Sequence, residues 1–89
     1  MDGKCFICGK WGPLETHHVF NGPFRKKSDR MGYVVELCHW CHNEPPLGVH
    51  FNADLDNALK AYFQDIAMKE HGWTKEDFIR DFGRSYTDA

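Results

Sequence analysis

The sequence predicts a small α+β domain, on three observations. Residues 1–50 are rich in turn-forming residues and carry two Cys-x-x-Cys pairs, whereas residues 51–89 carry apolar residues at helical spacing. At 89 residues the chain has room for one modest core, so a bound metal or another constraint is expected to stabilise it. We therefore expect one domain over residues 1–89, in which a zinc-binding, β-containing part precedes a long amphipathic helix and a short C-terminal helix.

The first half predicts two short strands with a loop between them. Residues 14–20 form a candidate strand that ends at the Asn-Gly-Pro run of residues 21–23, three turn-formers in succession. Residues 24–32 are polar and are expected to form a loop. Residues 33–37 are rich in β-branched and aromatic side chains, which is typical of a strand. The prolines at positions 45 and 46 exclude a long helix in the segment that follows.

The second half predicts two helices. Residues 52–70 place apolar side chains at spacings of three and four, which gives one apolar stripe on a helix that Gly72 ends. A shorter helix follows, with Thr74 as N-cap, acidic residues in its first turn and Gly83 as the residue that ends it. We expect the aromatic side chains of both helices to pack in the core, because core packing is the commonest use of such a stripe.

Charge is unevenly distributed along the chain, whose net charge is −2. Residues 1–50 carry six Lys and Arg against five Asp and Glu, and residues 51–89 carry five against eight. The densest basic cluster lies in the first half and consists of Arg25, Lys26, Lys27 and Arg30. A surface that contacts phosphate groups is expected there, with a solvated loop as the plainer alternative.

No segment has the composition of a membrane span or of a secretory signal. The N-terminal residues lack an apolar stretch, and nothing approaches the roughly 20 apolar residues that a membrane-spanning helix needs. We therefore expect a cytoplasmic protein without membrane contact. Thiols stay reduced in that compartment, so paired Cys-x-x-Cys motifs there hold metal more often than they form disulfides.

The strongest single signal is the pair of Cys-x-x-Cys motifs formed by Cys5, Cys8, Cys38 and Cys41. Two thiols at a spacing of three, each pair on a turn, fit the tetrahedral geometry of zinc at about 2.3 Å per Zn–S bond. We expect these four cysteines to hold one structural Zn²⁺ ion. A pair of disulfides is the alternative that the cysteine count leaves open.

Adjacent histidines at positions 17 and 18 form a second candidate site. On a strand, neighbouring side chains point to opposite faces, so His17 and His18 are expected to take different tasks. One imidazole is suited to ligate a divalent metal, and the other is suited to act as a general base, because histidine titrates near working pH. The plainer interpretation is one half-buried and one solvated histidine.

With their flanking residues, these motifs resemble the HNH endonuclease family. The matching residues are Cys5, Cys8, His17, His18, Leu37, Cys38, Cys41 and His42. They cover about residues 5–50, and the Gly-Val-His-x-Asn sequence at residues 48–52 resembles small HNH proteins of phages and prophages. The resemblance implies a ββα-metal fold, in which two strands and one helix hold a single catalytic ion, and a bacterial or phage-infected cell as the setting.

The resemblance also implies a role for each histidine. His17 and His42 would be ligands of a catalytic divalent ion such as Mg²⁺, Mn²⁺, Ni²⁺ or Zn²⁺, and His50 is the candidate third ligand. His18 would be the general base that deprotonates the attacking water. The implied activity is hydrolysis of DNA phosphodiester bonds, with Arg25 or Lys26 neutralising the phosphate.

A catalytically silent zinc-binding module of the same fold is the alternative. Such a module would bind nucleic acid, a nucleotide ligand or a protein partner. The acidic net charge favours it, as does the lack of the family's middle asparagine, which would fall at or near Tyr33. The intact histidine pair favours the enzyme. In either case a chain this small has little surface for sequence recognition, so a homodimer or a protein partner is expected to contribute.

Overall fold

Two short antiparallel strand pairs form the β part of the fold. The computed structural model describes residues 2–87. In it, β1 (Asp2–Lys4) pairs with β2 (Trp11–Pro13), and β3 (Glu15–His18) pairs with β4 (Val34–Leu37). With the helices described below, these pairs confirm the expected small α+β class, and both expected strands of the first half are present.

The register of β3 against β4 decides which side chains face the interior. His17 lies opposite Val35, and Glu15 lies opposite Leu37. Both partners on β4 are buried, and His17 itself is only 2% exposed. Because side chains alternate along a strand, Glu15 and His17 share one face. On the other face the Thr16 hydroxyl donates a hydrogen bond of 2.8 Å to the Glu36 carboxylate.

The prediction of a loop over residues 24–32 was wrong. A 3-10 turn, η1 (Gly22–Phe24), leads into the helix α1 (Arg25–Met31), which ends at Gly32 with a φ of 79°. The buried Ser28 hydroxyl accepts a hydrogen bond from the Phe20 N–H (3.2 Å) and donates one to the Tyr33 carbonyl (2.5 Å). This hydroxyl therefore fastens α1 to the ends of both strands.

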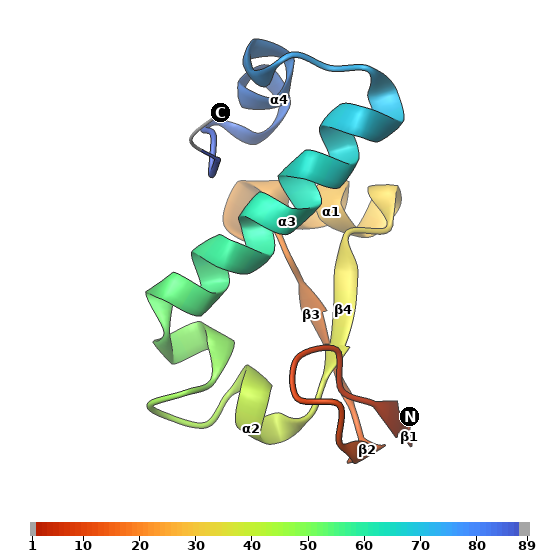
Figure 1. Cartoon of the computed structure of the whole chain (residues 1–89), viewed down its shortest axis with the longest axis vertical. Helices are drawn as coiled ribbons and strands as arrows, with labels where there is room; N and C mark the ends of the chain where they lie inside the picture. Colours follow the sequence, from red (N-terminus) through yellow and green to blue (C-terminus); the bar gives the residue numbers. More distant parts are fainter. Residues whose placement is uncertain (1, 88–89) are drawn as a thin grey trace.

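The helices of the second half begin and end where the sequence indicated. The helix α3 (Ala53–His71) is capped by Asn52, whose side chain accepts from the Leu55 N–H, and it ends at Gly72. The helix α4 (Lys75–Phe82) starts with a capping box between Thr74 and Asp77. Two shorter segments precede them, α2 (His39–His42) and η2 (Val49–Phe51). Figure 1 shows α3 crossing the middle of the molecule diagonally, from η2 towards α4.

An aromatic core lies at the end of the molecule where α1, α3 and α4 meet (Figure 1). Phe20, Phe78 and Phe82 are fully buried, and the ring centroids of Phe20 and Phe82 are 4.5 Å apart. Gln64 on α3 is also fully buried, and its side-chain carbonyl accepts from the Tyr86 N–H. This end of the domain is thus stabilised by packing.

Among the described helices, none is long and apolar enough to cross a membrane.

We expect Ser28→Ala to lower the free energy of unfolding by about 1–3 kcal/mol, because it leaves the buried Phe20 N–H without a partner. It also removes one of two hydrogen bonds to the Tyr33 carbonyl, which still accepts from the Val19 N–H. Urea denaturation of the zinc-loaded protein measures the change. Lys26→Ala, on an exposed position of the same helix, is the control and should change stability by less than about 0.5 kcal/mol. Equal stability of the two variants would contradict the role given to Ser28.

Candidate metal centres

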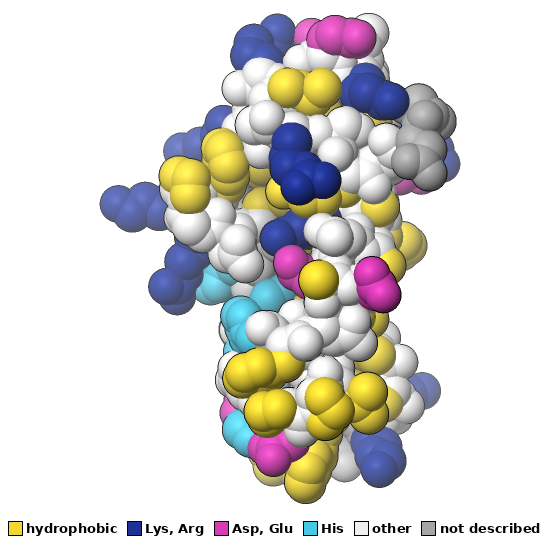
Figure 2. Space-filling model, turned by 90° about the vertical axis from the view of Figure 1, so that its left-hand side faces the viewer, with side chains coloured by type: hydrophobic (Ala, Val, Ile, Leu, Met, Phe, Trp, Pro, Cys, Tyr) yellow, Lys and Arg dark blue, Asp and Glu magenta, His cyan; other side chains and the backbone are white. Residues whose placement is uncertain are grey.

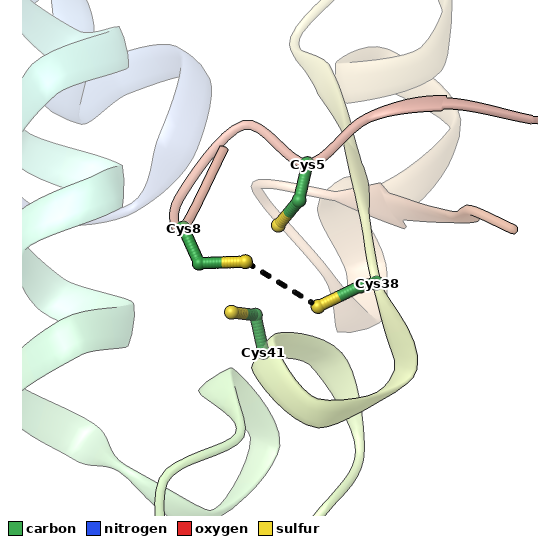
Figure 3. Close-up of side chains that lie close together, drawn as sticks. All are labelled: Cys5, Cys8, Cys38 and Cys41. Atoms are coloured by element: carbon green, nitrogen blue, oxygen red, sulfur yellow. Dashed lines mark hydrogen bonds between the residues drawn. The ribbon is translucent and has the colours of Figure 1, made fainter. Parts of the chain in front are cut away.

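The four cysteines converge on one point between the turn that follows β1 and the start of α2 (Figure 3). Cys5 and Cys8 lie in the turn after β1, Cys38 follows β4, and Cys41 lies on α2. Their Sγ atoms all lie within 4.8 Å of one another, and those of Cys8 and Cys38 are 3.7 Å apart. A zinc tetrathiolate with bonds of about 2.3 Å has sulfur–sulfur edges of about 3.8 Å. All four thiols are free, and the cluster could hold a structural zinc ion.

The backbone around the first cysteine pair favours a thiolate. Burial raises the pKa of the Cys5 thiol, but hydrogen bonds from the backbone N–H groups of Cys38, Cys8 and Ile7 outweigh it and bring the pKa to about 6. The Phe6 N–H also donates to the Glu36 carbonyl at 3.0 Å, which joins this turn to β4. At Cys5 the backbone therefore stabilises the thiolate, the form that binds zinc, whereas burial and the neighbouring cysteines raise the pKa of Cys41.

Three of the four histidines expected at the catalytic site lie together. His17 comes from β3, His42 from the end of α2 and His50 from η2, and each offers a nitrogen within 4.8 Å of the other two. The Nε2 atoms of His42 and His50 are 3.0 Å apart, and the His17 ring centroid lies 5.2 Å and 5.1 Å from theirs. These are the three residues for which the sequence suggested a shared ion.

A tight turn brings His50 back to His42 although eight residues separate them. The Gly48 N–H donates to the Glu44 carbonyl at 2.7 Å, so the chain folds back over the end of α2. A Cβ atom on Gly48 would lie 2.7 Å from the Glu44 nitrogen, closer than any real contact. Glycine is therefore required here for space, and the following residues reach the histidine cluster.

His17 carries an unsatisfied nitrogen. Its Nε2 atom is buried and has no hydrogen-bond partner among the described residues. Burial lowers the pKa of His17 to about 4, and the nearby His42 and His50 act in the same direction. The ring is thus neutral at physiological pH. A buried polar atom without a partner costs about 1–3 kcal/mol, which a bound cation at this position would offset.

His18 lies beside the cluster and has a carboxylate neighbour. Its Nε2 atom is 3.3 Å from the Asp29 carboxylate on α1. The sequence did not single out Asp29, whose polar surroundings resembled a loop. A shallow hollow joins His18 to the three clustered histidines, and its remaining lining residues are Thr16, Asn21 and Arg25. The predicted base and the predicted ligands therefore share one opening to solvent.

Glu15 is a further residue at the site that sequence analysis missed. Its carboxylate lies 2.8 Å from His42 Nδ1 and 3.2 Å from His39 Nδ1. These two hydrogen bonds lower the pKa of Glu15, so the group is ionised. The available signal was its place two residues before His17, on the same face of a strand.

The basic cluster lies next to the histidines, as Figure 2 shows for the Lys and Arg side chains on this face. Arg25, Lys26 and Arg30 project from α1 with exposed side chains, and Arg25 lines the histidine hollow. Lys27 is half-buried instead. Its ammonium donates to the Asp81 carbonyl at 2.9 Å, which fastens α1 to the end of α4. Lys27 therefore has a structural contact that the sequence did not indicate.

Trp11 and Trp40 lie at the surface beside the cysteine turns. They are 77% and 68% exposed. They line a shallow hollow together with Lys10, Pro13 and His39. The two tryptophans therefore give the cysteine turns little cover, and the aromatic contact of the first turn is Phe6, whose ring centroid lies 6.1 Å from that of Tyr62 on α3.

We expect Cys38→Ala to lose the bound zinc and to unfold the cysteine end of the domain, because it removes one of four converging thiols. Zinc content by elemental analysis and the near-UV circular dichroism spectrum measure both effects. The wild-type protein should carry close to one tightly held zinc ion and lose its fold when a strong chelator removes it. Trp40→Ala, an exposed neighbour on α2, should keep both zinc and fold. A folded, zinc-free Cys38→Ala protein would rule out a structural role for zinc.

The two clusters offer different donor chemistry within one small domain. A set of four cysteines suits Zn²⁺, whereas three imidazoles suit several divalent ions. Searches among protein-family models, curated proteins and solved structures find no match for this chain.

Proposed function

We propose that the protein is an HNH-type endonuclease that hydrolyses DNA phosphodiester bonds with one divalent ion and a histidine general base. The observation that carries the proposal is the convergence of the His17, His42 and His50 imidazoles at a hollow shared with His18, together with a buried His17 Nε2 atom that has no hydrogen-bond partner among the described residues. Buried polar atoms are nearly always satisfied in folded proteins, so this arrangement favours a ligand. On this proposal β3, β4 and the helical segment after them form the ββα-metal core.

His17, His42 and His50 would hold the divalent ion, which supplies Lewis-acid polarisation of the phosphate and stabilises the leaving oxygen. Imidazole nitrogen is an accepted ligand of Zn²⁺, Ni²⁺ and related ions. Three protein ligands would leave coordination positions open, as a catalytic site needs. The cysteine cluster, with four thiols, has the composition of a closed structural site.

His18 is the general base of the proposed reaction. With Nε2 donating to Asp29, the Nδ1 atom keeps the lone pair that accepts a proton from water. As that proton leaves, the water oxygen forms a bond to phosphorus and the bond from phosphorus to the leaving oxygen breaks. The leaving oxygen takes a proton from solvent, and His18 returns its own to solvent.

The exposed basic residues of α1 provide the proposed contact with DNA. Arg25 lines the histidine hollow, and Lys26 and Arg30 extend from the same short helix. Three cations on one face attract the phosphate backbone without reading base sequence. A second copy of the chain or another protein would supply the remaining contacts and any sequence preference.

We expect supercoiled plasmid to be nicked by the zinc-loaded protein when Mg²⁺, Mn²⁺ or Ni²⁺ is added. His18→Ala should lower the nicking rate by about 10²–10⁴-fold, the usual contribution of a general base. Gel electrophoresis over time measures the rate for each metal. His71→Ala, which removes an exposed histidine at the end of α3, is the matched control and should nick at the wild-type rate.

Wild-type protein that leaves DNA intact with every metal would contradict the nuclease. The silent module would then be the remaining proposal, and one specific observation favours it. Tyr33 lies near the position of the family's asparagine, and its side chain is not available to a site. It is only 3% exposed, and its ring packs against Phe20 and Phe63 in the core. Retained DNA binding without cleavage would identify nucleic acid as the ligand of that module.

Arg25→Ala and Arg30→Ala should each weaken DNA binding by a similar factor for all sequences. Each should lower the slope of log K against log salt by about 1, because one phosphate contact is lost. Fluorescence anisotropy of a labelled duplex at several salt concentrations measures both. Arg80→Ala on α4, where the side chain pairs with Asp77, is the control. An unchanged slope in both variants would show that α1 does not contact DNA.

A further inference from the structure

The Glu15 carboxylate lies between two histidines of α2. Its Oε1 atom is 2.8 Å from His42 Nδ1, and its Oε2 atom is 3.2 Å from His39 Nδ1. The side-chain amide of Asn43 also donates to Oε1, at 3.1 Å. One carboxylate on β3 is thus hydrogen-bonded to two residues of α2 and to the residue that caps it.

These contacts determine which nitrogen of His42 carries the proton. A carboxylate only accepts hydrogen bonds, and an unprotonated nitrogen at 2.8 Å from it would be repelled. His42 Nδ1 therefore holds the proton. The Asn43 amide nitrogen is 3.1 Å from the same atom but already donates to Glu15, so it does not require the other tautomer.

The opposite nitrogen of His42 is then an acceptor aimed at the cluster. Its Nε2 atom lies 3.0 Å from His50 Nε2 and belongs to the group that includes His17. The His42 side chain is 12% exposed, so solvent competes little for Nδ1. A metal ion binds only the lone pair of a neutral imidazole, so the tautomer fixed by Glu15 is the one that can coordinate.

Glu15 also fixes the position of α2 against β3. It precedes His17 by two residues on the same strand face, so the group that holds His42 is rigidly connected to the first histidine of the cluster. His39 contributes a second hydrogen bond to the same carboxylate, and its Nε2 atom lies 3.0 Å from Glu44. Two hydrogen bonds to one carboxylate therefore attach α2 to β3.

We propose that Glu15 is the positioning residue of the histidine metal site, which sets the tautomer and orientation of His42 for coordination. This inference rests on the proposed function in so far as that function requires an ion at His17, His42 and His50. Carboxylates that hold metal-binding histidines in this way typically change metal affinity by about 10–100-fold when removed. The same loss is expected here.

The test is a titration of Co²⁺ into protein whose cysteine site is already filled with zinc, followed by visible absorbance. Glu15→Gln should raise the dissociation constant for Co²⁺ by about 10–100-fold. The amide oxygen is a weaker acceptor than a carboxylate oxygen, and the amide NH₂ group would be directed at the Nδ1–H of either His39 or His42. Zinc content and thermal midpoint should stay at wild-type values. The matched control is Glu44→Gln, which removes the other carboxylate of His39 and touches none of the clustered histidines; its Co²⁺ affinity should not change.

A second measurement does not depend on the variant. Long-range ¹H–¹⁵N spectra of the zinc-loaded wild-type protein, with no second metal added, should show His42 protonated at Nδ1, the less common form of free histidine. In Glu15→Gln the Nε2-protonated form should increase. Wild-type His42 protonated at Nε2, or equal Co²⁺ affinities of wild type and Glu15→Gln, would overturn the inference.

The outcomes separate this inference from the proposed function. Wild-type protein that binds no Co²⁺ at the histidines overturns both. Wild-type protein that binds Co²⁺ but leaves DNA intact overturns the nuclease alone, and the comparison of Glu15→Gln with Glu44→Gln then still decides whether Glu15 positions His42.

Discussion

Closure of the four-cysteine cluster is the constraint on which the rest of the site depends. The end of the molecule that contains it has three-residue strands and exposed apolar side chains at Phe6, Trp11 and Trp40, so packing alone stabilises it poorly. A two-stranded ribbon of this size is at best marginal in water. A zinc ion bound by cysteines 30 residues apart would supply the missing free energy and would hold the two distant turns together.

The same closure aligns the histidines. Cys41 directly precedes His42, and Cys38 follows β4, whose partner β3 carries His17. A shift of the cysteine turns would therefore move two of the three clustered imidazoles relative to each other. Glu15 further fixes the position of His42, because its carboxylate joins β3 to α2 by direct hydrogen bonds. Structural and proposed catalytic sites are thus coupled through only a few residues.

Local signals predicted the parts of the fold that depend on local chemistry. The Thr74 cap, both helices of the second half and the strand before Cys38 are all present. The helix α1 was missed because its polar, basic sequence resembles a loop, and the Ser28 hydrogen bonds that fix it reach residues 20 and 33. Glu15 was missed for a related reason, since its partners lie on α2 and only the register of β3 brings them together. The resemblance to HNH proteins implied His17, His42 and His50 as ligands of one ion, but the spacing of the last two gave no sign of the turn at Gly48 that brings them together.

The single long helix α3 belongs to two differently stabilised regions. Its first residues follow η2 beside His50, whereas Gln64 and Ala67 near its other end are buried in the aromatic core. Backbone amides open in cooperative units whose free energies follow local packing and ligation. Amide hydrogen exchange should therefore vary along this one helix: amides in its first turns follow metal occupancy, and amides around Ala67 exchange only through global unfolding. One continuous element thereby reports on both ends of the domain.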